Sequence, residues 1–72
     1  MDYRFNVNIS YSEYQLYYSG AASSVVVTTD KGLRLQIPAA RFRPYLSQLG
    51  IRGRFKLTTD EENRFRSLER IA

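Results

Sequence analysis

Apolar and polar residues alternate at every position near the start of the chain, from Tyr3 to Ile9. Residues 51–57 follow the same alternation, with Gly53 at one of the apolar positions. A period of two residues is typical of β-strands that have one apolar face and one polar face. The polar positions of the second segment are all basic, and they are Arg52, Arg54 and Lys56. The pattern therefore predicts a sheet with a core side and a positively charged side.

A short helix is predicted directly after the first strand. Ser10 and Glu13 have the spacing of a capping box, in which each side chain bonds the backbone amide of the other residue. Gly20 stands where a left-handed residue commonly ends a helix, so we expect a helix over residues 11–19. One broad face of this helix carries four tyrosines, and we expect that face to pack on the sheet. They are Tyr11, Tyr14, Tyr17 and Tyr18, and Leu16 lies nearly opposite them.

Residues 24–38 are predicted to form a β-hairpin around the turn at residues 30–32. A three-residue turn with Gly32 in the left-handed region pairs Thr29 with Leu33, Val27 with Leu35 and Val25 with Ile37. This register places all six side chains on one face. A shift of one residue would turn the whole apolar set toward water, which strengthens the prediction.

The connection after the hairpin is predicted to contain one helical turn. Pro38 suits the first helical position, and Pro44 is expected to end or kink the turn. The apolar residues of this connection are expected to anchor it to the core, and they are Phe42, Tyr45 and Leu46. A strand over residues 51–58 follows.

The last segment, from about Arg64, fits two interpretations. Phe65, Leu68 and Ile71 are spaced by three residues, which suits a short helix. A strand with a bulge near residues 67–68 would also place Phe65 and Leu68 inward. Because residues 59–63 have turn chemistry, we predict a strand.

Length and composition indicate one domain. The chain has 72 residues, which is near the size at which a single core is only just large enough to hold a fold together. Its 43% hydrophobic and 14% aromatic residues are typical of an ordered domain. We therefore expect residues 1–72 to form one α+β domain in the order β-α-β-β-turn-β-β. Its small antiparallel sheet would have about five strands and one helix on its apolar face, and the pattern leaves open whether the sheet curls toward a small barrel.

The basic strand is the first candidate for a functional surface. The net charge is +4, and like charges on neighbouring strands cost about 0.2–1 kcal/mol each unless an anion offsets them. Nucleic acid is the obvious polyanion. The alternative is a solvated sheet face that Glu69 and the acidic residues 60–62 partly neutralise. The candidate contacts are Arg52, Arg54 and Lys56, with Arg64 and Arg66 on the last strand, and Arg34 and Arg4 on other strands.

Two outward apolar residues suggest a different kind of surface. Leu16 on the helix and Val26 on the hairpin would form a small apolar patch of the kind that an adaptor or a homodimer uses. The alternative is that each is an ordinary exposed apolar residue. The tyrosines of the helix suggest a further interpretation, in which Tyr17 or Tyr18 stacks on an unpaired base of RNA. RNA-binding sheets, however, carry their aromatic residues on the exposed strand face, whereas the strand aromatics here fall on the apolar side. The tyrosines are therefore better explained as part of the core or of a partner surface.

Several classes of function are disfavoured by what the chain lacks. It has no cysteine and no histidine, so we expect neither a metal nor a redox site, and no cofactor. The sequence contains neither a pair of carboxylates at a catalytic spacing nor a phosphate-binding loop, so we expect that the protein is not an enzyme. An alternating strand at the amino terminus and the lack of a long apolar run predict a cytoplasmic location without membrane insertion.

Six short motifs occur in an order that resembles one family. They are Ile9-Ser10-Tyr11, Ser24-Val25-Val26-Val27-Thr28, Ile37-Pro38-Ala39, Arg43-Pro44-Tyr45, Gly50-Ile51-Arg52-Gly53-Arg54-Phe55 and Ser67-Leu68. Over nearly its whole length the chain resembles the short bacterial proteins grouped as domain of unknown function 2835. The resemblance implies a bacterial, stand-alone domain and no activity, so it assigns no functional residues. We therefore expect a small non-enzymatic adaptor or regulator that binds protein, with nucleic-acid binding through the basic strand as the alternative.

Overall fold

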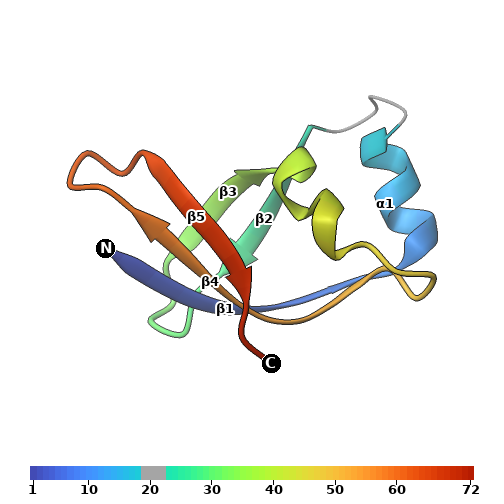
Figure 1. The fold of residues 1–72 in the computed structure, drawn as a ribbon, viewed down its shortest axis with the longest axis horizontal. Helices are drawn as coiled ribbons and strands as arrows, with labels where there is room; N and C mark the ends of the chain where they lie inside the picture. Colours follow the sequence, from blue (N-terminus) through green and yellow to red (C-terminus); the bar gives the residue numbers. More distant parts are fainter. Residues whose placement is uncertain (19–22) are drawn as a thin grey trace.

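The computed structural model describes residues 1–18 and 23–72. The described residues form five strands, one α-helix and one 3₁₀ helix (Figure 1). In chain order these are β1 (Asp2–Ile9), α1 (Tyr11–Tyr18), β2 (Ser24–Thr28), β3 (Arg34–Pro38), η1 (Ala39–Tyr45), β4 (Ile51–Thr59) and β5 (Phe65–Arg70). The predicted order of elements is confirmed, and the last segment is a strand.

The strands form two antiparallel sheets, so the prediction of a single sheet of about five strands is wrong. β4 lies between β1 and β5 in a three-stranded sheet, and β2 pairs with β3 in a two-stranded sheet. The two sheets meet at one corner, where Phe5 and Thr29 form an isolated bridge. Next to this bridge the Asp30 amide donates to the Arg4 carbonyl oxygen at 2.9 Å. The pairing stops there, and the strands do not close into a barrel.

The apolar faces of both sheets enclose an aromatic core. Phe5 of β1, Phe42 of η1 and Phe55 of β4 have no exposed surface. The Phe55 ring meets the rings of Phe42 and Tyr45 edge to face, with centroids 5.5 and 5.1 Å apart, which is a favourable arrangement for aromatic pairs. The predicted anchoring of the connection by Phe42 and Tyr45 is therefore confirmed.

Helix α1 begins with the predicted capping box. The Glu13 amide donates to the Ser10 hydroxyl oxygen at 3.1 Å, and the Ser10 amide donates to the Glu13 carboxylate at 3.4 Å. Tyr14 is buried, and its hydroxyl donates to the Ala39 carbonyl oxygen at 2.9 Å. Tyr11 is exposed, so the tyrosine face packs only in part, and α1 lies at one end of the molecule rather than across a sheet (Figure 1). The predicted end of the helix at Ser19 and Gly20 lies outside the described residues.

The hairpin has the predicted register but not all of the predicted burial. Val25 pairs with Ile37 and Val27 pairs with Leu35. Leu33 was expected to face the core but is 48% exposed, because it precedes β3 at the turn end of the hairpin.

β5 carries a bulge, as predicted, although its position and effect differ. Thr58 pairs with Ser67 and Thr59 pairs with Phe65, which leaves Arg66 as the extra residue. Leu68 faces inward opposite Leu57 and is half-buried, whereas Phe65 is 36% exposed.

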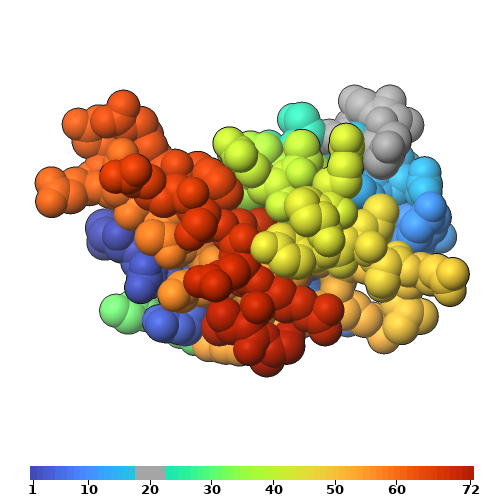
Figure 2. All heavy atoms as spheres, viewed as in Figure 1, coloured from blue at the N-terminus to red at the C-terminus, as the bar shows by residue number. Residues whose placement is uncertain are grey.

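The outer edge of β5 is covered by η1. Figure 2 shows the two elements side by side on one face of the molecule. The Tyr45 hydroxyl donates to the Leu68 carbonyl oxygen at 2.6 Å, and the Arg41 guanidinium lies 4.0 Å from the centre of the Phe65 ring. These contacts explain why Phe65 packs under an arginine at the edge instead of entering the core.

Candidate functional site

The basic row of β4 exists where the sequence predicts it. In the ladder with β1, Arg52 lies opposite Asn8, Arg54 opposite Asn6, and Lys56 opposite Arg4. All of these side chains project away from the aromatic core, because the residues between them are the inward-facing ones.

Arg54 does not present a free charge. Its guanidinium forms a two-point ion pair with Asp30, with Nη1 3.2 Å from Oδ1 and Nη2 bonded to Oδ2. Nη1 also donates to the Asn6 side-chain oxygen at 3.4 Å, so Arg54 reaches across β1 to a carboxylate at the end of β2. The hydrogen bonds from Arg54 hold the pKa of Asp30 below its ordinary value of 3.8. The charges of Arg54 and Arg4 act in the same direction, and desolvation opposes them.

The other two members of the row differ from each other. The Lys56 ammonium lies 3.2 Å from a carboxylate oxygen of Glu69, its neighbour on β5. The Arg52 Nε donates to the Asn8 side-chain oxygen at 3.2 Å, and no described carboxylate forms an ion pair with Arg52. Two of the three basic side chains are therefore neutralised within the chain.

The remaining basic candidates are distributed over other parts of the surface. Arg64 precedes β5 and forms ion pairs with Asp60, at 3.2 Å, and with Glu62. Backbone hydrogen bonds, the largest from the Arg64 amide, lower the pKa of Asp60 against the opposing effect of desolvation. Arg66 is the exposed residue of the bulge, and Arg34 lies opposite Thr28 in the other sheet. The structure does not gather all six candidates into one patch.

Leu16 and Val26, the two residues of the expected apolar patch, lie on different elements of the structure. Both are more than half exposed, Leu16 on α1 and Val26 on β2. Val26 lines a cleft between β1 and β2, and Leu16 is not among the residues that line it.

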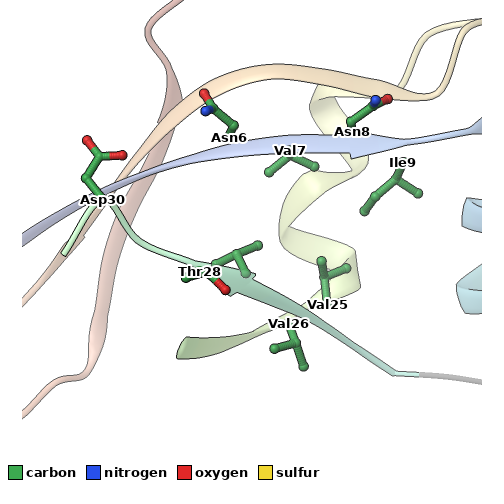
Figure 3. A pocket seen from close by; sticks show the side chains of 9 residues that line it. Asn6, Val7, Asn8, Ile9, Val25, Val26, Thr28 and Asp30 are labelled. Atoms are coloured by element: carbon green, nitrogen blue, oxygen red, sulfur yellow. The ribbon is translucent and has the colours of Figure 1, made fainter. Parts of the chain in front are cut away.

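This cleft has a volume of about 350 Å³, which is within the range of about 300–1,000 Å³ that is usual for ligand pockets. In Figure 3 the two strands approach each other near Asp30 and diverge toward Ile9 and Val25, whose side chains point toward one another. Asn6 and Asn8 lie on the other side of β1 from Val7 and Ile9 (Figure 3). The cleft is lined by Asn6, Val7, Asn8 and Ile9 of β1, by Val25, Val26, Val27 and Thr28, and by Asp30.

The backbone of β1 turns an unpaired edge toward this cleft. In an antiparallel ladder, successive residues direct their N–H and C=O groups to opposite edges of the strand. The Arg4 carbonyl accepts a bond from Asp30 on the side away from β4, so Asn6 and Asn8 direct their backbone groups to that same side. The bridge between Phe5 and Thr29 places Asn6 opposite Thr28, so the Asn6 amide is directed at the Thr28 carbonyl oxygen. Beyond this bridge no ladder joins β1 to β2 among the described residues, which leaves Asn8 as the open position of the β1 edge.

β2 turns a second unpaired edge toward the same cleft. The Thr29 amide donates to the Leu33 carbonyl oxygen at 2.8 Å, so odd-numbered residues of β2 face β3. Val26 and Thr28 therefore direct their backbone groups toward β1, where Thr28 meets Asn6 next to the bridge and Val26 lies beyond it. Two strand edges thus face each other across the cleft. Such edges usually pair with another strand or are protected from pairing.

Sequence reasoning identified Val26 but missed the cleft. Alternation assigns residues to faces and says nothing of which edges pair. The one available signal was the pair Asn6 and Asn8, which places two neutral residues on the outward face of a strand next to the basic one.

Two classes of site receive no support from the described residues. No group of three or more acidic, histidine or cysteine side chains is placed to hold a metal ion there. In the same part of the chain, no helix has the length and apolar character needed to span a membrane.

Comparisons with known proteins bear on the identity of the chain. No curated protein and no solved structure matches it. One family model matches residues 1–71, which is nearly the full 72-residue sequence, and it is the family that the six motifs resemble. The chain therefore belongs to the family described as protein of unknown function (DUF2835).

Proposed function

We propose that this protein is a small protein-binding module that takes up an extended segment of a partner in the cleft between β1 and β2. The observation that carries the proposal is the pair of strand edges that face each other across the cleft without a ladder between them. An extended segment bound there would pair its backbone with Asn8, beyond the bridge, in the manner of a strand added to a sheet. Main-chain hydrogen bonds would supply affinity, and the cleft walls would supply selectivity.

The outer edge of β5 gives a useful contrast. Its Leu68 carbonyl is already bonded by the Tyr45 hydroxyl, and η1 packs along it. On the β1 edge, Asn6 faces Thr28 next to the bridge, whereas no ladder pairs Asn8 with another described strand on the cleft side. This difference favours the cleft as the binding edge.

Binding of nucleic acid through the basic row is the second candidate, and the net charge of +4 favours it. Its weakness is the pairing of Arg54 with Asp30 and of Lys56 with Glu69. A phosphate would have to displace both carboxylates, and affinity for nucleic acid rises with the number of phosphates that are neutralised.

The test of the proposal is to select a phage-displayed library of random short peptides against the purified protein. Enriched peptides are then measured against Asn8→Pro and against Asn8→Ala. Proline removes the amide that faces the cleft, whereas alanine keeps that amide and removes only the side chain. We expect binding to be lost in the proline variant and retained in the alanine variant. Enrichment of no peptide, or equal binding by both variants, would contradict strand addition at this edge.

A further inference from the structure

We infer that a nucleobase with its phosphate binds in a pocket between β3 and β5, where the base stacks on Phe65 and the phosphate meets Arg41. This pocket is separate from the cleft between β1 and β2, so the inference goes beyond the proposed function and does not depend on it. Phe65 is the strand aromatic that was expected to face inward, yet it is 36% exposed. It lines two hollows, one toward β3 and one toward η1.

The hollow toward β3, called the β3–β5 pocket from here on, has the size and the walls for one planar ring. Its volume is about 210 Å³, which is smaller than the range of about 300–1,000 Å³ that is usual for drug-sized ligands. Its exposed apolar residues are Phe65 and Pro38, whereas Ile37 and Leu57 line it from the core. Aromatic side chains of this kind stack on unpaired bases in proteins that bind single strands.

Polar groups beside the β3–β5 pocket match the edge of a base. The odd-numbered residues of β3 pair with β2, and the bond from the Ala39 amide to the Ser23 carbonyl oxygen continues this pattern. Gln36 therefore directs its backbone N–H and C=O away from β2, and Gln36 lines the pocket. Asn63 adds a side-chain amide, whose oxygen accepts from the Tyr3 hydroxyl at 3.0 Å. A donor next to an acceptor is the pattern that base edges present.

Arg41 supplies a positive charge on the other side of the ring's edge of the sheet. The 3₁₀ helix η1 turns Ala39, Phe42 and Tyr45 toward the core at a spacing of three, which leaves Arg41 outside. Its guanidinium lies 4.0 Å from the centre of the Phe65 ring, and no described carboxylate forms an ion pair with it. Arg41 lines the hollow toward η1 but not the β3–β5 pocket, so it does not block the ring there.

This charge distinguishes the site from the basic row of β4. Two of the three side chains in that row are held by carboxylates, which a phosphate would have to displace. A phosphate at Arg41 displaces none among the described residues, and the planar guanidinium suits a phosphate while it stays stacked on the ring.

The first test uses fluorescence, because the chain contains no tryptophan. Phe65→Trp keeps an aromatic ring at the pocket and adds one indole, whose emission falls when a base stacks on it. The probes are a mixed-sequence single-stranded RNA of about six nucleotides and adenosine monophosphate. We expect both to lower the emission. Tighter binding of the RNA would identify a strand as the source of the base, and equal binding would identify a free nucleotide.

The second test measures the affinity of the same RNA by chemical-shift titration of the isotope-labelled protein. Phe65→Leu keeps an apolar side chain without a ring, and it should weaken binding at least about fivefold, the low end for one stacked base. Arg41→Gln should reduce the slope of log K against log salt by about 0.7, as for one lost phosphate contact on a single strand. The matched change Arg52→Gln in the basic row should alter neither quantity.

Three results would overturn the inference. If Arg52→Gln weakens RNA binding and Phe65→Leu does not, nucleic acid binds the basic row instead. If neither probe lowers the indole emission or shifts the amides of Gln36 and Phe65, no base binds in the pocket. If a library-selected peptide shifts these two amides and the RNA does not, the pocket binds protein. None of these results decides on strand addition, which the substitutions at Asn8 test separately.

Discussion

Proline at Asn8 tests whether the β1 edge is open in solution, through the stability of the protein. The Asn8 amide faces the cleft, so Asn8→Pro should cost no ladder hydrogen bond. The matched control is Thr58→Pro on β4, which is also an outward residue with one side-chain hydrogen bond, to Asp2 at 3.2 Å. The Arg54 amide donates to Ala72, so every second residue of β4, including Thr58, directs its amide toward the β5 side.

The two variants should differ clearly in stability. Thr58→Pro loses a ladder hydrogen bond worth about 1 kcal/mol and leaves a carbonyl unpaired at a further cost of about 1–3 kcal/mol, so about 2–4 kcal/mol in total. A domain of this size has a total stability of roughly 4–11 kcal/mol, and each kcal/mol lowers its Tm by about 4–8 °C. We therefore expect Thr58→Pro to lower the Tm by roughly 8–32 °C, and Asn8→Pro to lower it by less than about 8 °C relative to Asn8→Ala.

Thermal unfolding followed by circular dichroism measures both shifts, with Asn8→Ala as the baseline for the lost contact with Arg52. If Asn8→Pro lowers the Tm as much as Thr58→Pro does, the Asn8 amide is already paired. The cleft would then be closed in solution, and strand addition at β1 would be refuted.

Two further changes test the frame around the cleft. Gly50→Ala should prevent folding, because a Cβ atom there would lie 2.0 Å from the Ile9 carbonyl oxygen and the φ of this residue is +100°. Gly32 also has a positive φ, of +83°, but a Cβ atom there would have nothing within 4 Å. Gly32→Ala should therefore lower the free energy of unfolding, measured by chemical denaturation, by only about 1–2 kcal/mol. The pKa of Asp30 is lowered in the folded state, so its contribution to stability is complete above the ordinary value of 3.8 and is lost as the pH falls below that value. The Tm of Asp30→Asn should therefore decrease less between neutral and acidic pH than the Tm of the unchanged protein. If both decrease equally, the ion pair does not stabilise the fold.

Local patterns in the sequence predicted the local structure well. The spacing of Ser10 and Glu13 identified the start of α1, and the alternation around Gly32 identified the register of the hairpin. Each of these features depends on residues that are close in the sequence, so that few alternatives satisfy the hydrogen bonds and the apolar face together.

Features that depend on distant residues were not predictable in this way. A period of two assigns side chains to faces but leaves open which strand edges pair, so the split into two sheets and the cleft between β1 and β2 were missed. The basic row was placed correctly, yet its neutralisation was only partly anticipated, because Asp30 lies 24 positions from Arg54. The exposure of Phe65 likewise follows from Arg41, which η1 brings to the edge of β5.

Amide hydrogen exchange of Asn8 is the most direct measurement of the central claim, that the β1 edge pairs with an extended segment. In the free protein this amide should exchange much faster than those of Phe5 and Val7, which face β4. In complex with a library-selected peptide, the Asn8 amide should slow while those of Phe5 and Val7 stay unchanged. Protection of Asn8 in the free protein, or its continued fast exchange in the complex, would contradict the account.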